Sequence, residues 1–371
     1  MKKALKNGKV FQIMEDWAPK HFAYDWDSVG LQVGSFQNKA RKIMVTLDVL
    51  ENVVDEAIEE DVDLIIAHHP LLFKPIKQIN FDQAKGRVLK KLLAHDITVY
   101  AAHTNLDITN GGVNDMLCEA LDIQSIEVLK TIDTEKLFKL AVFVPEEAVT
   151  TVMQALHNSG AGHIGEYSHC TFRTKGTGTF KPLDGTTPYI GKQNELTSVS
   201  ELKIETIVPL SKLQVCIEAM KLAHPYEEVA YDVYPLQLAG EPYGLGRIGK
   251  LQEKITLSNL CEKVKEYFHL DAVRVIGDVE QEVQKVAILG GSGENYIQTA
   301  KQRGADVYIT GDLTFHTAQD ALDLGLSVID AGHYIEKVMK DGVKHYLTQK
   351  LKEYDVEIVT SSSVTDPFQF I

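Results

Sequence analysis

Short apolar runs alternate with amphipathic stretches at both ends of this chain, and this alternation limits the folds that it can adopt. The apolar runs have the length of buried strands and lie at 42–47, 62–67, 97–102, 286–289, 307–310 and 326–329. The amphipathic stretches have helical periodicity and lie at 51–60, 84–95, 113–121, 296–303, 317–324 and 334–351. Strands that alternate with helices form βαβ units, so the two ends are predicted to have an α/β fold with mainly parallel strands.

The middle of the chain has a different pattern, an internal repeat with an offset of 64 residues. Phe143-Val144-Pro145 recurs as Ile207-Val208-Pro209. Each copy is predicted to contain a strand, a proline at the entrance of a helix, the helix and a second strand, and two such copies are typical of a ferredoxin-like α+β fold. The Gly/Thr-rich stretch 174–187 between the copies is predicted to be a hairpin or a long loop.

We therefore predict one discontinuous, αβ-layered domain that is interrupted by an inserted domain. Its first segment is 1–129, the ferredoxin-like insert is 130–240, and the second segment is 241–371. A length of 371 residues agrees with two or three domains.

Polar side chains that can bind metal ions follow five of the predicted strands. Ligand sites in open α/β sheets lie outside the carboxyl ends of the strands, so these side chains are expected to lie together. They are Asp48, His68 and His69, His103 and Asp107, Asp312 and His316, and His333 and Glu336.

Imidazole and carboxylate groups together suit zinc, iron, manganese, nickel or cobalt. None of the four cysteines forms a C-x-x-C pair, which argues against a closed structural zinc site. The five candidate ligands are more than one tetrahedral ion needs; they are His68, His69, Asp107, His333 and Glu336. With a bridging carboxylate they suffice for two ions about 3.5–4 Å apart, which can activate water and neutralise an anionic substrate.

Taken singly, each of these residues also fits a structural role. Asp107 and Asp312 fit helix caps, and Glu336 suits the first turn of a helix without any metal. The segment 224–228 (His-Pro-Tyr-Glu-Glu) lies at a turn of the insert, where a structural or subunit-contact role is favoured over catalysis. The glycines at 290–293 suit an anion at a helix start, but they lack the third glycine of a dinucleotide fingerprint.

Charge and hydropathy argue against two classes of partner. With 38 basic and 52 acidic residues the net charge is −14, and no basic run interleaved with aromatics occurs, so nucleic-acid binding is not expected. No stretch approaches the ~20 apolar residues of a membrane span, and no signal-peptide pattern follows the N-terminal lysines. Because the cysteines also fit a reducing compartment, a cytoplasmic location is expected.

Several motifs, in this order, resemble the Ngg-interacting-factor-like dinuclear metal-centre family, whose bacterial members are called GTP cyclohydrolase 1 type 2 homologues. The segment 25–34 resembles the family's W-D-N-x-G-L-x-x-G opening, with Ser28 in place of the usual asparagine. The other matching motifs are His68-His69-Pro70, 103–107 (His-Thr-Asn-Leu-Asp), 244–249 (Gly-Leu-Gly-Arg-Ile-Gly) and Gly332-His333-x-x-Glu336. Within the insert, 224–232 is similar to the small trimeric CutA and PII modules.

The resemblance implies a metal site and an assembly. It implies ligands at the five residues named above, with Glu336 as the bridge between two divalent ions, for which zinc is the first choice. It also implies a hollow, toroidal homohexamer in which the inserted domains form trimers. The expected function is a dinuclear-metal hydrolase acting on GTP or a related nucleotide, with His103, Asp312 or His316 as acid or base. The alternative is a metal-binding regulatory or scaffold protein whose insert senses a ligand or partner.

Overall fold

The structure, a computed structural model, describes residues 3–371 and has the mixed α/β class expected from the sequence. The chain divides into two compact units, Met1–Ile132 with Tyr243–Ile371, and Asp133–Pro242. We call the first the outer unit and the second the inserted unit. Among the described helices, none combines the length and the apolar character that a membrane crossing requires.

The first sheet of the outer unit has five strands in the order β1-β4-β3-β2-β13. They are β1 (Gly30–Val33), β2 (Lys42–Thr46), β3 (Leu64–Ala67), β4 (Thr98–Ala101) and β13 (Glu357–Thr360). All neighbours pair in parallel except β1, which is antiparallel to β4.

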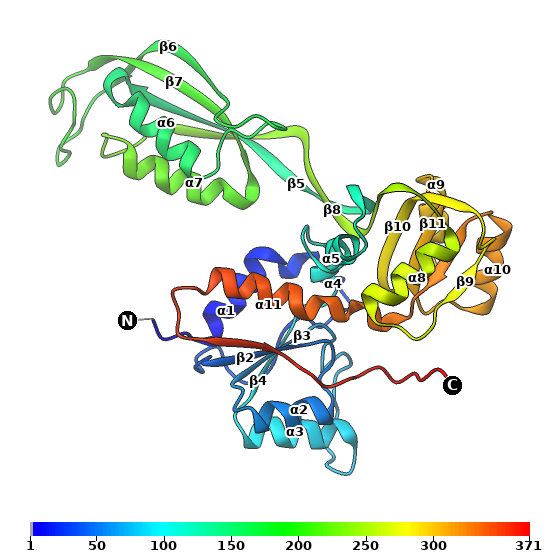
Figure 1. The fold of residues 1–371 in the computed structure, drawn as a ribbon. Helices are drawn as coiled ribbons and strands as arrows, with labels where there is room; N and C mark the ends of the chain where they lie inside the picture. Colours follow the sequence, from blue (N-terminus) through cyan, green and yellow to red (C-terminus); the bar gives the residue numbers. More distant parts are fainter. Residues whose placement is uncertain (1–2) are drawn as a thin grey trace. The chain divides into compact units, whose positions relative to one another are not determined.

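Helices cover both faces of this sheet, as Figure 1 shows for α2 and α3 below it and α1 and α11 above it. Their bounds are α1 (Asn7–Trp17), α2 (Glu51–Glu59), α3 (Ala84–Ala94) and α11 (Met339–Lys350). Met44 and Ile65 pack toward α2 and α3, whereas Ile43 and Leu64 belong to the opposite core cluster. Because both faces are buried, the strands are continuously apolar rather than alternating, which is why they stand out in the sequence.

The second sheet contributes β8, β10, β11, β12 and β9 to the outer unit, in that order. The central strands β10, β11 and β12 are parallel, and β8 and β9 flank them antiparallel. The bounds are β8 (Tyr231–Thr256), β9 (Arg274–Ile276), β10 (Glu282–Ser292), β11 (Val307–Gly311) and β12 (Ser327–Asp330). The remaining helical segments of this unit are η1 (Lys20–Phe22), α4 (Thr104–Ile108), α5 (Val113–Ala120), α8 (Leu257–Phe268), η3 (Glu294–Tyr296), α9 (Ile297–Gln302), α10 (Phe315–Asp323) and η4 (His333–Val338).

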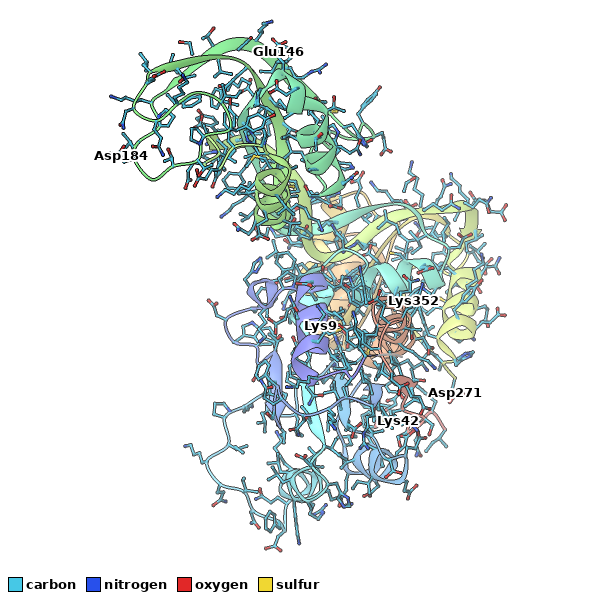
Figure 2. The ribbon with its side chains drawn as sticks, turned by 90° about the vertical axis from the view of Figure 1, so that its left-hand side faces the viewer. Lys9, Lys42, Glu146, Asp184, Asp271 and Lys352 are labelled. Carbon is cyan, nitrogen blue, oxygen red and sulfur yellow. The ribbon has the colours of Figure 1, made fainter. Side chains whose placement is uncertain are left out.

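The inserted unit follows the succession strand, helix, strand, strand, helix, strand, which is that of ferredoxin-like folds. Its strands are ordered β6-β7-β5-β8, and Figure 1 shows α6 and α7 together on one face of them. The bounds are β5 (Gln124–Pro145), η2 (Glu146–Ala148), α6 (Val149–Asn158), β6 (Thr171–Phe180), β7 (Thr197–Pro209) and α7 (Leu210–Ala223). Charged side chains such as Glu146 and Asp184 lie at its margin (Figure 2).

The hairpin expected around 174–187 is present, since β6 runs to Phe180 and pairs antiparallel with β7, which begins at Thr197. One local expectation was wrong. The glycines at 290–293 do not open a helix directly, because β10 continues to Ser292 and the short η3 comes before α9.

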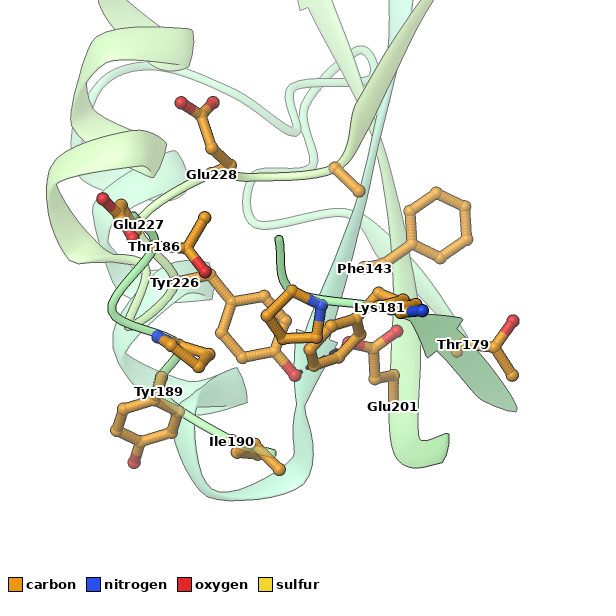
Figure 3. A pocket seen from close by; sticks show the side chains of 15 residues that line it. Phe143, Thr179, Lys181, Thr186, Tyr189, Ile190, Glu201, Tyr226, Glu227 and Glu228 are labelled. Carbon is orange, nitrogen blue, oxygen red and sulfur yellow. Dashed lines mark hydrogen bonds between the residues drawn. The ribbon is translucent and has the colours of Figure 1, made fainter. Parts of the chain in front are cut away.

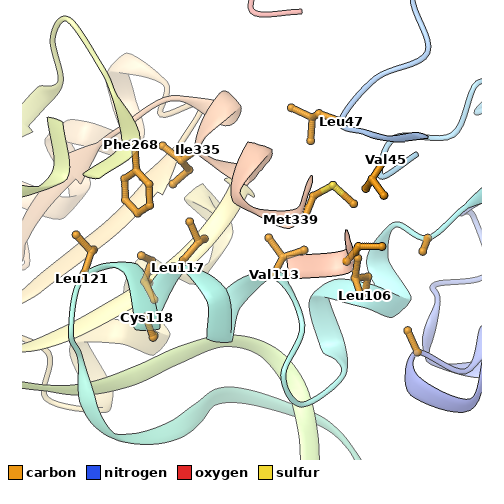
Figure 4. Close-up of a cluster of buried hydrophobic side chains, with 14 of the residues drawn as sticks. Val45, Leu47, Leu106, Val113, Leu117, Cys118, Leu121, Phe268, Ile335 and Met339 are labelled. Atoms are coloured by element: carbon orange, nitrogen blue, oxygen red, sulfur yellow. The ribbon is translucent and has the colours of Figure 1, made fainter. Parts of the chain in front are cut away.

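The largest core cluster of the outer unit holds α5 against the segment that carries His333 and Glu336. Figure 4 shows side chains of α5 facing those of η4 and α11. The facing residues are fully buried; they are Val113, Leu117, Cys118, Ile335 and Met339. This packing fixes the position of η4, which carries two candidate metal ligands, relative to α5.

Arg247, in the motif 244–249, ties the same region together. Its guanidinium is 1% exposed. It donates to both carboxylate oxygens of Asp115 at 2.9 and 2.6 Å. It also donates to the backbone carbonyls of Gly244, Gly246 and Thr109 at 2.8, 2.9 and 3.0 Å. The motif is therefore a structural one here, since it joins β8 to the loop between α4 and α5.

We expect Arg247→Met to lower the free energy of unfolding by about 3–5 kcal/mol, because Asp115 loses its charged partner and three backbone carbonyls lose the hydrogen bond from this guanidinium. The matched control is Arg303→Met, which breaks an exposed pair with Glu127 and should cost less than ~1 kcal/mol. Urea denaturation of both variants measures the difference. Equal losses for the two variants would contradict this role for Arg247.

Candidate metal centre

Four histidines meet at the carboxyl ends of the strands of the outer unit. His68 and His69 directly follow β3, His103 lies between β4 and α4, and His333 opens η4 after β12. The ring centroids are 5.2 Å apart for His68 and His69, 5.2 Å for His68 and His103, and 5.1 Å for His69 and His333. Residues from distant parts of the sequence are thus brought together at one place, as the strand ends predicted.

Glu336 lies among these rings and is 4% exposed. Its Oε2 is 3.1 Å from Nε2 of His69 and 3.2 Å from Nε2 of His333. The same oxygen is 3.8 Å from Nε2 of His68. One carboxylate oxygen is therefore within reach of three imidazole nitrogens.

The potential donor atoms fall into three overlapping groups, in each of which all atoms lie within 4.8 Å of one another. The groups are His69 with His333 and Glu336, His68 with Asp107 and Glu336, and His68 with His69 and His103. The first two groups share only Glu336. The five residues proposed as ligands from the sequence are all present in these two groups.

Two buried polar atoms of this cluster lack a hydrogen-bond partner among the described residues, namely Nε2 of His68 and Oδ1 of Asp107. They lie 3.5 Å apart. A buried polar atom without a partner costs about 1–3 kcal/mol, so such atoms are rare unless something else binds them. A cation bound by both atoms would satisfy them, and the donor set therefore fits a metal ion.

Each of the four rings is held at its other nitrogen, Nδ1, so that Nε2 faces the cluster. This second contact is typical of metal-binding histidines, since it fixes the tautomer and the ring orientation. The Nδ1 contacts are His68 to the carbonyl of Ala102 at 2.8 Å, His69 to Asp48 at 2.7 Å, His103 to Asp27 at 2.9 Å and His333 to Asp312 at 2.7 Å.

Three residues behind the rings were not predicted to orient them. Asp27 lies in the motif 25–34 but was not connected to His103. Asp48 was noted at a strand end but not as the partner of His69. Thr365 donates to Oδ2 of Asp48 at 2.6 Å from the C-terminal segment. No spacing rule points to such partners, because each lies far in sequence from the histidine that it supports.

The three residues proposed as acid or base have different positions. His103 is in a donor group with His68 and His69. Asp312 contacts the outer nitrogen of His333 and so orients a candidate ligand. His316 lies on α10, contacts Gln319 at 3.2 Å and belongs to none of the donor groups of the described residues. A catalytic role for His316 therefore gains no support from its contacts.

The pKa values of the cluster reflect close packing of carboxylates and imidazoles. Burial alone lowers the pKa of His69, but hydrogen bonds to Asp48 and Glu336 outweigh it and raise the pKa to about 10. The hydrogen bond to Glu336 raises the pKa of His333 to about 9. Burial, and then the charge of Glu336, raises the pKa of Asp107 to about 8. At neutral pH, protons therefore compete for the positions that a metal ion would take, and metal affinity should rise with pH.

Gly291 makes room for Glu336 rather than for an anion. A Cβ atom at this position would lie 2.5 Å from Oε1 of Glu336, and the backbone has a φ of +65°. The amide of Gly290 already donates to Asn114 at 3.0 Å. A carboxylate beside these glycines disfavours the anion-binding role suggested for them.

Exposed aromatic rings border the cluster on the side of His103. Trp26 and Phe73 are 58% and 42% exposed. Their ring centroids lie 5.8 Å apart, and they are 6.2 and 6.3 Å from the His103 ring, respectively. Large exposed rings beside candidate ligands offer a face on which a planar substrate can stack.

We expect Asp48→Ala to weaken zinc binding by about 10–100-fold, because His69 loses the carboxylate that orients it. The control is Asp55→Ala on α2, which removes only a surface pair with Lys91. Competition with a chromogenic chelator gives both affinities. An unchanged affinity in Asp48→Ala would show that His69 needs no such support.

Comparison with known proteins gives consistent matches along the whole chain. The family model of Duf34/NIF3 (NGG1p interacting factor 3) matches residues 5–367. The GTP cyclohydrolase 1 type 2 homolog of Bacillus subtilis is 51% identical over 373 residues, with 100% of each chain covered. A Bacillus cereus protein related to NIF3 has a crystal structure with a TM-score of 0.93, 48% identity and 100% coverage of both chains. A Staphylococcus aureus crystal structure gives a TM-score of 0.74 at 31% identity, with 99% of both chains covered.

Proposed function

The chain belongs to the Duf34/NIF3 family, and from this premise we propose that it is a metal-dependent hydrolase with two divalent ions that acts on GTP or a related nucleotide. The observation that carries the proposal is the sharing of Glu336 by two donor groups. His68, Asp107 and Glu336 would hold one ion, and His69, His333 and Glu336 the other. When bound, such ions supply an activated water and neutralise an anionic substrate.

The residues around the donors support this reading. Asp27 holds Nδ1 of His103 at 2.9 Å, so the other nitrogen of this ring is free to exchange a proton with a substrate. Trp26 and Phe73 would bind the face of a purine. The net charge of −14 repels nucleotides, so the attraction has to come from the site itself. The name of the Bacillus subtilis relative, a GTP cyclohydrolase 1 type 2 homolog, agrees with a nucleotide as substrate.

We further propose that zinc is the native metal and that the chain assembles as a toroidal homohexamer of dimers and trimers in the cytoplasm. The metal is argued from the histidine-rich donor set. The assembly is argued from the resemblance of the insert to trimeric modules, and the location from the four free cysteines, which fit a reducing compartment.

We expect freshly purified protein to contain about two divalent ions per chain, and the metal-loaded protein to convert GTP to a new product. Elemental analysis gives the metal content, and chromatography after incubation with a panel of nucleotides gives the turnover. His345→Ala, an exposed substitution on α11, is a control for adventitious binding to surface histidines. One ion or none after reloading would falsify the dinuclear proposal. Two ions without turnover of any nucleotide would favour the regulatory alternative.

A further inference from the structure

The inserted unit contains a cavity of about 380 Å³ that no part of the metal site lines. Figure 3 shows it between the ends of β6 and β7, the loop that joins these strands, and the turn after α7. The rings of Phe180, Tyr189 and Tyr226 are among the residues that line it. Figure 3 shows Ile190 at one side and Glu201 next to the hydroxyl of Tyr226. All lining residues fall within 143–230, so the cavity belongs to this unit alone.

Glu201 is the central polar group of the cavity, and it is 8% exposed. Its Oε1 accepts a hydrogen bond from the hydroxyl of Tyr226 at 3.0 Å. Within residues 3–371 no donor reaches Oε2, and no lysine, arginine or histidine forms an ion pair with this carboxylate. Oε2 is not one of the fully enclosed polar atoms of the described residues, so a cationic ligand can reach this carboxylate and supply the counter-charge that it lacks.

The remaining charges of the lining favour a cationic ligand over an anionic one. Glu227 and Glu228 add two carboxylates, and Lys181 is the one basic residue of the lining. Glu227 also accepts a hydrogen bond from the amide of Thr187 at 3.0 Å, which holds the joining loop beside the cavity. Glu227 and Glu228 are exposed, and Figure 3 shows the Glu228 carboxylate directed away from Glu201, so Glu201 is the carboxylate that a phosphate or carboxylate ligand would meet inside the cavity.

The aromatic walls suit the body of such a cation. The ring centroids of Phe180 and Tyr189 lie 6.0 and 6.1 Å from that of Tyr226. Aromatic faces attract ammonium groups and also bury apolar or planar groups attached to them. A bare metal ion would find one carboxylate and mostly apolar walls, which is a poor ligand set.

His224 gives the turn after α7 its shape. Its Nε2 donates to the carbonyl of Phe143 at 3.0 Å, and its Nδ1 accepts from the amide of Tyr226 at 3.1 Å. These contacts hold the backbone of Tyr226 so that its hydroxyl reaches Glu201. The segment 224–228, for which the sequence favoured a structural or subunit-contact role, thus builds one wall of the cavity.

We propose that this cavity binds a small organic cation, with its ammonium group at Oε2 of Glu201 and an apolar or aromatic body against Tyr189 and Tyr226. At about 30 Å³ per non-hydrogen atom, the volume admits a ligand of about a dozen such atoms. The site is separate from the metal centre in its residues and in its chemistry, and it does not depend on the proposed hydrolase activity.

The test uses the full chain with 13C-labelled isoleucine methyl groups, in which Ile190 reports on the cavity. The probes are 2-phenylethylammonium, the neutral 2-phenylethanol and the anion 3-phenylpropionate. We expect the ammonium to shift the Ile190 methyl signal and to bind at least ~10-fold more tightly than the alcohol, as a charged hydrogen bond implies. Glu201→Gln should remove this preference and leave binding of the alcohol unchanged.

The matched control is Glu205→Gln, four residues further along β7, where the carboxylate pairs with Lys203 outside the cavity. It should leave all three affinities unchanged. If Glu201→Gln does not fold, Tyr189→Ala decides, since this ring is 54% exposed and its loss should weaken ammonium binding about 3-fold or more. Equal binding of ammonium and alcohol, preference for the anion, or an Ile190 signal that no probe moves would each overturn the proposal.

Discussion

Glu336→Ala is expected to remove divalent metal from the chain and to lower nucleotide turnover by more than ~100-fold, the upper end of what loss of a supporting residue costs a metal site. The reason is that Oε2 of Glu336 lies 3.1 Å from Nε2 of His69 and 3.2 Å from Nε2 of His333, and that the same residue belongs to the group of His68 and Asp107. No other carboxylate is shared by these two groups. Its loss therefore weakens both proposed ion positions at once.

Two further variants make the result specific. Glu336→Gln keeps the volume of a side chain that is 4% exposed, so it separates loss of charge from a packing defect. Glu353→Ala removes an exposed carboxylate that pairs with Lys3, and it should change neither metal content nor turnover. Elemental analysis and the nucleotide assay give the two readouts. Full metal content in Glu336→Ala, or turnover equal to that of the unchanged chain, would refute the bridging role.

The position of the site could be predicted because its residues follow strands that are easy to recognise. The run Leu64–Ala67 is buried on both faces, so His68 and His69 stand directly after an unmistakable strand. His333 and Glu336 likewise follow β12, which is fully buried. The strands β3 and β4 are neighbours in one sheet, so the rule that ligand sites lie at the carboxyl ends of strands predicts that His68 and His69 lie near His103. The strand β12 belongs to the second sheet, so the approach of His333 and Glu336 depends on how the two sheets of the outer unit pack.

The sequence could not separate ligands from the residues that orient them. Asp312 and Asp107 both follow predicted strands, yet Asp312 contacts the outer nitrogen of His333, whereas Asp107 presents an unpartnered oxygen to the cluster. The distinction depends on which side of a ring each carboxylate reaches. Side-chain direction at this precision is a result of tertiary packing, which no local pattern encodes.

The sequence left the bounds of β6 open, for a similar physical reason. It is an edge strand that pairs only with β7, and most of its ten residues are exposed. It therefore lacks the alternation of apolar and polar residues that marks a half-buried strand, and its glycines at 176 and 178 are more typical of turns. Gly178 instead lies against Glu201, whose Oε2 would be 2.2 Å from an added Cβ atom.

Removal of the inserted unit is expected to leave the metal site intact and to reduce the proposed hexamer to a dimer. All five candidate ligands lie outside Asp133–Pro242. The strands that enter and leave this unit, β5 and β8, are neighbours in the sheet, and Gly244 lies directly against the carbonyl of Lys130. A two-residue Asn-Gly turn in place of Asp133–Pro242 can therefore close them as a hairpin.

The expected loss of assembly follows from the edge strand of the insert. An exposed edge such as β6 offers unpaired backbone groups, which a neighbouring copy can cover. A heterologous contact of this kind closes into a three-fold ring, and a second, isologous contact through the outer unit would double the ring to six chains.

Light scattering distinguishes the states, since the intact particle should have the mass of six 41.3 kDa chains and the shortened one the mass of two. Elemental analysis of the shortened protein should still give two ions per chain, which also serves as evidence that it has folded. A shortened protein that remains hexameric would place the three-fold contact in the outer unit. An intact chain that is monomeric at micromolar concentration would rule out the assembly altogether, and a folded, shortened chain without metal would show that the two units do not function independently.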